Sequence, residues 1–269
     1  MEEEKNEMSF LGHLEELRWH LVRSAAAIFI IGILLFVFQK EVFNHFLLAH
    51  RKSDFITYQI FCDFFNLFGM DSTFCNVAFT DNLISLKPTQ QLMTAIWSSL
   101  ILGIILAFPY LLWELWRFIS PGLTKKEVKS SRGFMFIASF LFFCGIAFSF
   151  YVIAPISIHF LYNYKISDVI QNNFTLESHI GLVTNMLLGV SVLFELPVLV
   201  YFLTKIGLVT PEFLKTYRKH ALVLVLILAA IITPPDVASQ VIVAIPILVL
   251  YEISIKVSRM VIKKQKKDA

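Results

Sequence analysis

Glu195 is an acidic residue inside a strongly apolar run, residues 189–203, that holds no other charge. An acidic side chain at the centre of a membrane helix costs about 2.5–3.5 kcal/mol on insertion scales. Such a residue is usually retained because a partner, a cavity or a ligand requires it. Glu195 is therefore a candidate intramembrane site. The alternative is a protonated side chain that bonds a neighbouring helix for packing alone.

Motifs of enzymes and metal sites are missing from the sequence. It contains no His-Glu-x-x-His, no Gly-x-Ser-x-Gly, no P-loop and no Gly-x-Gly-x-x-Gly. His13, Glu15 and Glu16 resemble a metal site only superficially, because no second His or Cys stands nearby at ligand spacing. We therefore expect no enzymatic activity, no cofactor and no metal, and we see no basic patch for nucleic acid.

The composition indicates a membrane protein. Hydrophobic residues make up 57% of the chain and charged residues 16%, whereas soluble domains carry about 25% charged residues. The apolar residues gather in six segments, and about 20 such residues cross a bilayer. These segments are 23–38, 92–113, 133–154, 180–204, 221–232 and 237–255. The sequence thus predicts an all-α, polytopic membrane protein with six transmembrane helices in a single domain, residues 1–269.

The fifth and sixth transmembrane helices are expected to be short. Segment 221–232 would extend only about 18 Å as a helix. Two consecutive prolines, Pro234 and Pro235, follow it and cannot continue a helix.

Lys and Arg residues are distributed unevenly between the two sides that six spans create. The N-terminus, the loops between helices 2 and 3 and between helices 4 and 5, and the C-terminus carry 18 of the 23 residues. The positive-inside rule then places both termini in the cytoplasm. The basic tail, residues 256–269, is expected to lie along anionic membrane lipids.

The long exterior loop, residues 39–91, holds an aromatic stretch and two cysteines. Phe61, Phe64, Phe65 and Phe68 recur at helical spacing, which predicts a helix that lies on the outer leaflet or packs on the bundle. Cys62 and Cys75 are expected to form a disulfide, because the exterior compartment is oxidising. The alternative is two buried free thiols. Cys144, in the third apolar segment, is expected to stay reduced.

Eight short segments along the chain carry a resemblance to a known family. They are FLGHLEELR (10–18), FPY (108–110), ELWRFISPGL (114–123), FYVIAP (150–155), FELP (194–197), TPPDVASQ (233–240) and AIP with YEI (244–246 and 251–253). Together they resemble the TatC family, the core subunit of the bacterial twin-arginine protein translocase. The long exterior loop with its two cysteines departs from the family pattern.

The resemblance implies both an architecture and a function. The architecture is a glove-shaped bundle of six helices in the bacterial inner (plasma) membrane. The function is export of folded proteins, driven by the proton-motive force, after recognition of a signal peptide with an Arg-Arg pair. The implied partners are these signal peptides and single-span proteins of the TatA/TatB type. The implied assembly is a homo-oligomer within a hetero-complex.

The resemblance also assigns residues to signal-peptide binding. Glu16 and Glu127 match the family's two recognition positions, and carboxylates are the natural partners of two guanidinium groups. Considered without the family, Glu16 fits a solvated face of an amphipathic helix better than a site, and Glu127 likewise fits a charged loop. Arg18 is expected to structure the site. Phe118 would support the recognition loop or contact the peptide, and Trp116 is a weaker interfacial candidate.

A second group of residues belongs, by the same resemblance, to the membrane interior. Thr233 and Gln240 match a polar site where a partner's transmembrane helix docks, and Glu195 would anchor a partner helix or the inserted signal peptide. The competing hypotheses are a proton-coupled solute carrier that uses Glu195 and a structural membrane scaffold. The carrier leaves the cytoplasmic acids without a role, and the scaffold explains none of the acids.

Overall fold

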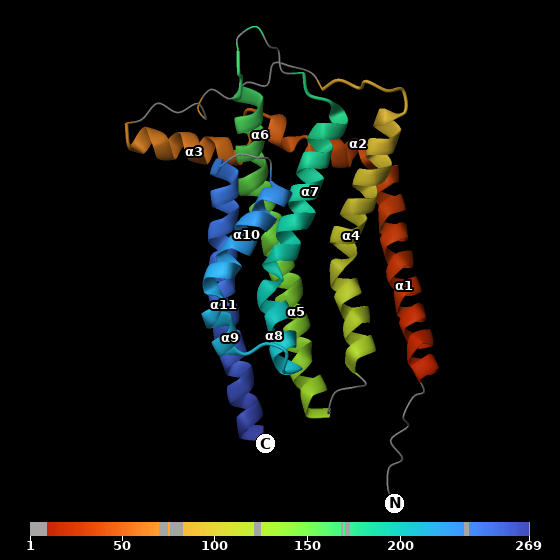
Figure 1. The fold of residues 1–269 in the computed structure, drawn as a ribbon. Coiled ribbons are helices and arrows are strands. Elements are labelled where there is room, and N and C mark those ends of the chain that lie inside the picture. Colours follow the sequence, from red (N-terminus) through yellow and green to blue (C-terminus); the bar gives the residue numbers. More distant parts are fainter. Residues whose placement is uncertain are drawn as a thin grey trace, which may run out of the picture. The chain divides into compact units, whose positions relative to one another are not determined.

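The computed structural model describes residues 10–69, 75, 83–120, 125–167, 169, 173–233 and 237–268. In this part of the chain the regular structure is helical (Figure 1), apart from one isolated parallel bridge between Ile84 and Thr175. The predicted all-α class is confirmed.

α-Helices make up most of the described chain. They are α1 (Phe10–Val37), α2 (Gln39–Val42), α3 (Ile56–Leu67), α4 (Gln90–Ile119), α5 (Lys125–Phe148), α6 (Ala154–Asn163), α7 (Leu176–Phe194), α8 (Leu196–Lys205), α9 (Pro211–Thr216), α10 (Arg218–Ile232) and α11 (Val237–Asp268). A π-helical turn, Ser149–Ile153, joins α5 to α6. Proline stands in the first turn of α6, α8 and α9. A backbone N–H has no partner within the helix at this position, so proline breaks no helical hydrogen bond there.

Five helical segments of the described chain are long and apolar enough to cross a membrane. They are Leu14–Val37, Gln90–Ile119, Met135–Asn163, Leu176–Lys205 and Ser239–Gln265. The fifth predicted helix, α10, is apolar but has only 15 residues, about 22 Å of helix, and is short as expected. The sixth differs from the expectation, because α11 has 32 residues and continues through the basic tail. No Gly or Pro after residue 255 interrupts it.

The chain forms two compact units. The first unit comprises Met1–Gln39 and Ile96–Ser139, and the second comprises Lys40–Ala95 and Phe140–Ala269. The first unit therefore contains α1 and most of α4, together with the first part of α5. The second unit contains the exterior loop and the remaining helices.

In the first unit, α1 and α4 approach closely at two glycines. A Cβ atom on Gly103 would lie 3.0 Å from the Ile28 carbonyl oxygen, and one on Gly32 would lie 3.5 Å from that of Ser99. Small residues allow such close backbone contact between membrane helices. Gly32, the later residue on α1, lies near Ser99, the earlier residue on α4, whereas the earlier Ile28 lies near the later Gly103. The two helices are therefore antiparallel.

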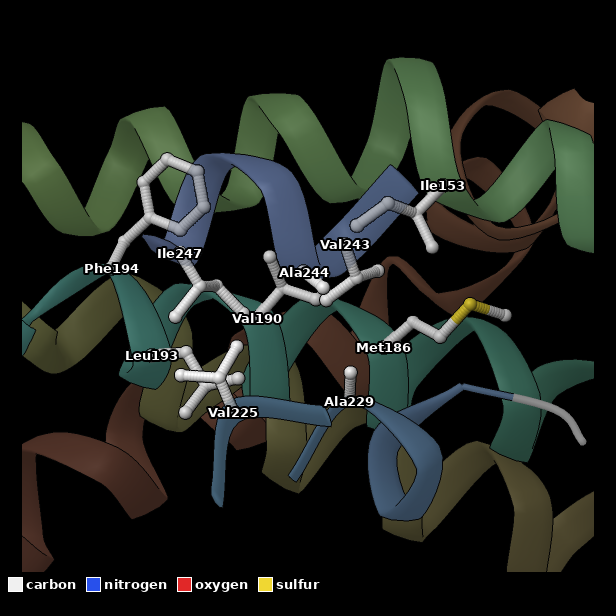
Figure 2. Close-up of a cluster of buried hydrophobic side chains, with 10 residues drawn as sticks. All are labelled: Ile153, Met186, Val190, Leu193, Phe194, Val225, Ala229, Val243, Ala244 and Ile247. Atoms are coloured by element: carbon white, nitrogen blue, oxygen red, sulfur yellow. The ribbon is translucent and has the colours of Figure 1, made fainter. Parts of the chain in front are cut away.

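In the second unit, an apolar core joins the π-helical turn, α7, α10 and α11 (Figure 2). Its buried side chains are Ile153, Met186, Val190, Leu193, Phe194, Val225, Ala229, Val243, Ala244 and Ile247. Glycine again permits the contacts, since a Cβ atom on Gly145 would lie 2.6 Å from the Ser191 Cα, and one on Gly189 would lie 2.8 Å from the Ile232 side chain. This packing fixes α7, the helix that precedes Glu195.

Within the second unit, α3 is packed near its N-terminal end and exposed farther along. Tyr58 is buried and its hydroxyl donates to the His50 carbonyl oxygen at 2.9 Å. Phe64, Leu67 and Phe68, farther along, are exposed. Figure 1 shows α3 running across the direction of α6. The packed end agrees with the predicted packing on the bundle, and contact of the exposed apolar side chains with the outer leaflet stays a prediction.

Cys62 and Cys75 are joined by a disulfide, with Cα atoms 4.8 Å apart, and Cys144 is a free thiol. We expect the same pattern in protein isolated from cells, because the loop is predicted to face the oxidising side. Mass spectrometry after alkylation without reduction should detect modification at Cys144 alone. Alkylation of both loop cysteines would contradict the prediction.

His50 is a buried histidine, and its Nε2 donates to the Phe150 carbonyl oxygen at 2.9 Å. Burial lowers the pKa of His50 from 6.5 to about 4. Between pH 4 and pH 6.5, His50 therefore carries more bound proton in the unfolded chain than in the folded chain. The stabilisation is therefore complete above pH 6.5 and is lost as the pH falls toward 4.

Thermal unfolding in detergent should show this effect as a stability loss of up to roughly 3 kcal/mol over the acidic range. His50→Gln has no proton to gain at this position and should show a flatter dependence on pH. An equal slope in the parent and the variant would assign the acid sensitivity to other groups.

Candidate functional site

Glu114 is the centre of a buried polar cluster in the first unit. Only 1% of this α4 residue is exposed. Its carboxylate contacts His20 Nδ1, accepts a hydrogen bond from the Tyr110 hydroxyl at 2.8 Å, and lies 3.6 Å from an Arg23 guanidinium nitrogen. A buried carboxylate is stable only with such donors around it. Glu114 was not predicted as a site from the sequence. Its position as an acidic residue at the end of an apolar segment is the feature that could have indicated one.

Two facing stripes of side chains build this cluster. On α1, Glu16, His20 and Arg23 share one face, because residues four and seven apart stand above one another on a helix. On α4, Tyr110, Glu114 and Phe118 recur at four-residue spacing. The Phe118 ring lies edge-on to the His20 ring, with centroids 6.0 Å apart. Glu16 lies one turn before His20 on α1, and Phe118 lies one turn after Glu114 on α4. Because the helices are antiparallel, Glu16 lies at the level of Phe118.

Glu16 is half-buried, and its Oε2 atom is buried with no hydrogen-bond partner in the part of the chain that the structure describes. We refer to this atom as the open oxygen of Glu16. Arg18 lies elsewhere, because it pairs with the exposed Glu15 at 3.4 Å and its guanidinium stands 5.5 Å from the Trp19 ring centre. Trp116 is buried in the same unit.

Glu127 lies in the first turn of α5, and its side chain is outside the described part of the structure. Its backbone belongs to the first unit, together with Glu16, Arg18 and Phe118. The four residues that the sequence assigned to signal-peptide binding therefore share one compact unit.

Glu195 lies in the second unit, at the junction of α7 and α8. Both carboxyl oxygens are buried, and neither has a hydrogen-bond partner among the described residues. Pro197 in the first turn of α8 has no N–H, so the helical bonding of α7 is interrupted here. The Glu195 carbonyl oxygen instead accepts from the amides of Val198 and Leu199 at 3.0 and 2.9 Å. The junction leaves a carboxyl group with its hydrogen-bonding capacity unused.

Thr233 and Gln240 lie in the same unit, near the end of α10 and the start of α11. Thr233 is buried, and its hydroxyl donates to the Ala229 carbonyl oxygen at 2.9 Å. The Gln240 amide donates to the Leu226 carbonyl oxygen at 3.0 Å. Both side chains therefore contact α10, and they belong to the same unit as Glu195, whereas the residues assigned to signal-peptide binding belong to the other unit.

The helices and their polar groups define a multi-pass α-helical membrane protein with carboxyl groups open to a ligand or a partner. A family model described as Sec-independent protein translocase protein (TatC) matches residues 12–246. The chain therefore belongs to the TatC family, as its sequence motifs indicated.

Relatives and solved structures agree with this assignment. The TatC protein of Blattabacterium sp. subsp. Periplaneta americana is 40% identical over 98% of this chain and 100% of its own length. The TatC protein of Helicobacter pylori (strain J99) is 38% identical over 93% of this chain and 88% of its own length. A crystal structure of the twin-arginine translocase receptor TatC, in the detergent DDM, superimposes with a TM-score of 0.70 at 32% identity, covering 90% of this chain and 97% of that one.

Proposed function

We propose that this chain is the core receptor subunit of a twin-arginine translocase. In this role it binds the signal peptides of folded cargo and organises TatA/TatB-type partners for export driven by the proton-motive force. The observation that carries the proposal is the open oxygen of Glu16, a buried acceptor on a half-buried residue that no described residue satisfies. The membership in the TatC family supports it.

The chemistry of recognition follows from the ligand. Two adjacent guanidinium groups remain charged at any working pH and present fork-shaped donors. Glu16 offers one carboxylate acceptor, and Glu127, in the same unit, offers a second. Phe118 stands at the level of Glu16 beside His20 and supplies an apolar surface next to the charged groups. Arg18, held by Glu15, serves the local structure of α1 and takes no part in binding.

The second unit supplies the groups for partner helices. Glu195 offers a buried carboxyl group, and Thr233 and Gln240 offer polar atoms near the end of α10 and the start of α11. Hydrogen bonds between membrane helices contribute about 0.6 kcal/mol each on average. Docking of a TatA/TatB-type helix at these residues is therefore modest in affinity and reversible.

The proposed topology places both termini in the cytoplasm of a bacterial inner membrane, because 18 of the 23 Lys and Arg residues then face the cytoplasm. Alkaline phosphatase fusions after Asp71 and Lys165 are expected to be active. Fusions after Lys129, Lys215 and Lys267 are expected to be inactive. Activity of the C-terminal fusion would overturn the six-span topology.

Export of a twin-arginine reporter tests the proposed function. The strain should carry this chain as its sole TatC protein, with the TatA/TatB-type partners from the same source. The reporter should reach the exterior compartment in its folded form, and replacement of its Arg-Arg pair by Lys-Lys should abolish export. A reporter that stays in the cytoplasm, although the chain is present in the membrane, would contradict the proposal.

A further inference from the structure

The basic side chains of α1 present a problem for a receptor that binds cations. His20 stands four residues after Glu16, and Arg23 stands seven residues after it, on the same face. Glu followed four residues later by a basic residue is an attractive pair on a helix. Long side chains on a helix also lean toward its N-terminus, which directs Arg23 toward Glu16. Left alone, these groups would compete with the signal peptide for the Glu16 carboxylate.

We propose that Glu114 prevents this competition by holding His20 and Arg23, and so keeps Glu16 available to the twin arginines. The inference rests on the proposed function. Glu114 is then a positioning residue, since it acts on the signal peptide only through Glu16.

The contacts in the first unit support this role. Glu114 Oε2 contacts both His20 Nδ1 and an Arg23 nitrogen, and Oε1 accepts from the Tyr110 hydroxyl. Among the described side chains of α1, Arg18 is also basic, and it is paired with Glu15. These three basic groups therefore contact acids other than Glu16, and the open oxygen of Glu16 has no partner among the described residues.

Burial explains why Glu114 holds these groups in preference to Glu16. The Glu114 side chain is 2% exposed, so loss of its donors would leave an uncompensated charge in a site of low dielectric constant. Charge interactions are also stronger there than at a surface. Glu16 is half-buried and is screened in part by solvent. The basic groups are therefore more stable against Glu114.

Binding of a fluorescent twin-arginine peptide to the full-length chain in detergent tests the inference. Glu114→Gln removes the holding charge and should weaken binding about two- to fivefold, the range expected when two freed basic groups each pair with Glu16 at the usual strength of a helix ion pair. The triple variant Glu114→Gln with His20→Gln and Arg23→Gln removes the competitors as well and should restore the parent affinity. A merely structural role of the cluster predicts the opposite, because each further substitution would then weaken binding more.

The matched control is Glu252→Gln. It frees Arg218 from a 2.7 Å ion pair in the second unit, and it should leave the affinity unchanged. Thermal unfolding should show that each variant is folded. If Glu114→Gln does not fold, the double variant His20→Gln with Glu114→Gln replaces it in the comparison, with Arg23 as the competitor.

The outcomes separate this inference from the proposed function. A parent chain that does not bind the peptide contradicts the proposed function. A parent that binds, together with a Glu114→Gln chain of equal affinity, overturns the inference alone. A triple variant that binds as weakly as Glu114→Gln overturns it as well, since removal of the competitors would then have no benefit.

Discussion

Replacement of Glu127 by Lys is expected to abolish binding of a twin-arginine peptide to the detergent-solubilised chain. The substitution removes one of the two carboxylates proposed to hold the guanidinium groups and sets a cation in its place. Like charges at a binding site repel, and two arginines cannot lose their charge to escape this. Glu127→Gln removes the charge without adding another and should weaken binding by about 1.5–3 kcal/mol, the range for hydrogen bonds to charged groups. Titration by fluorescence anisotropy measures both effects.

The matched control for this charge reversal is Glu212→Lys. Glu212 is exposed in the first turn of α9 and belongs to the second unit. The same change of charge there should leave the affinity near that of the parent. A Glu127→Lys chain that binds as tightly as the parent would remove Glu127 from the recognition site.

Replacement of Glu195 by Ala is expected to abolish export and partner crosslinking while the twin-arginine peptide still binds. The two carboxyl oxygens of Glu195 are buried, and no described residue satisfies them, so a partner helix or an inserted signal peptide can bond there. Glu195 and the proposed recognition residues belong to different units. Loss of the side chain should therefore separate transport from binding. Reporter export, crosslinking to a TatA/TatB-type partner and peptide binding provide the three measurements.

Glu195→Gln distinguishes an anchoring role from proton coupling. An amide donates and accepts hydrogen bonds as a neutral carboxyl group does, so an anchor should retain much of the export. A proton-coupled carrier predicts the reverse, because an amide cannot release a proton. Export abolished by Gln, in a protein that is stable and assembled, would assign the coupling role to Glu195.

The helical architecture could be predicted from the sequence because membrane spans are encoded locally. Each long span coincides with an apolar run, and the short α10 follows from the length of segment 221–232. Segment 180–204 was predicted as one span, and the structure adds a junction at Glu195, where Pro197 interrupts the helix. The extent of α11 was missed, since hydropathy marks the end of the bilayer and not the end of a helix. Its basic tail has good helix formers and continues the helix.

The partners of the acidic residues could not be predicted in the same way. His20 and Glu114 are separated by 94 positions, and no spacing rule relates residues on different helices. Their contact depends on the antiparallel register that Gly32 and Gly103 set between α1 and α4. The sequence identified Glu16 only by its resemblance to a family position. The structure adds the buried environment that leaves its oxygen open.

Photo-crosslinking of a twin-arginine signal peptide tests the central claim most directly. A peptide with a photoreactive group beside its Arg-Arg pair should crosslink to residues of the first unit around Glu16 and Phe118. Competition by an unlabelled twin-arginine peptide should remove the product, and a twin-lysine peptide should not. Glu16→Gln should reduce the yield. Crosslinks confined to the second unit, or an equal yield with the twin-lysine peptide, would contradict the assignment of Glu16 and Glu127 as the twin-arginine receptor site.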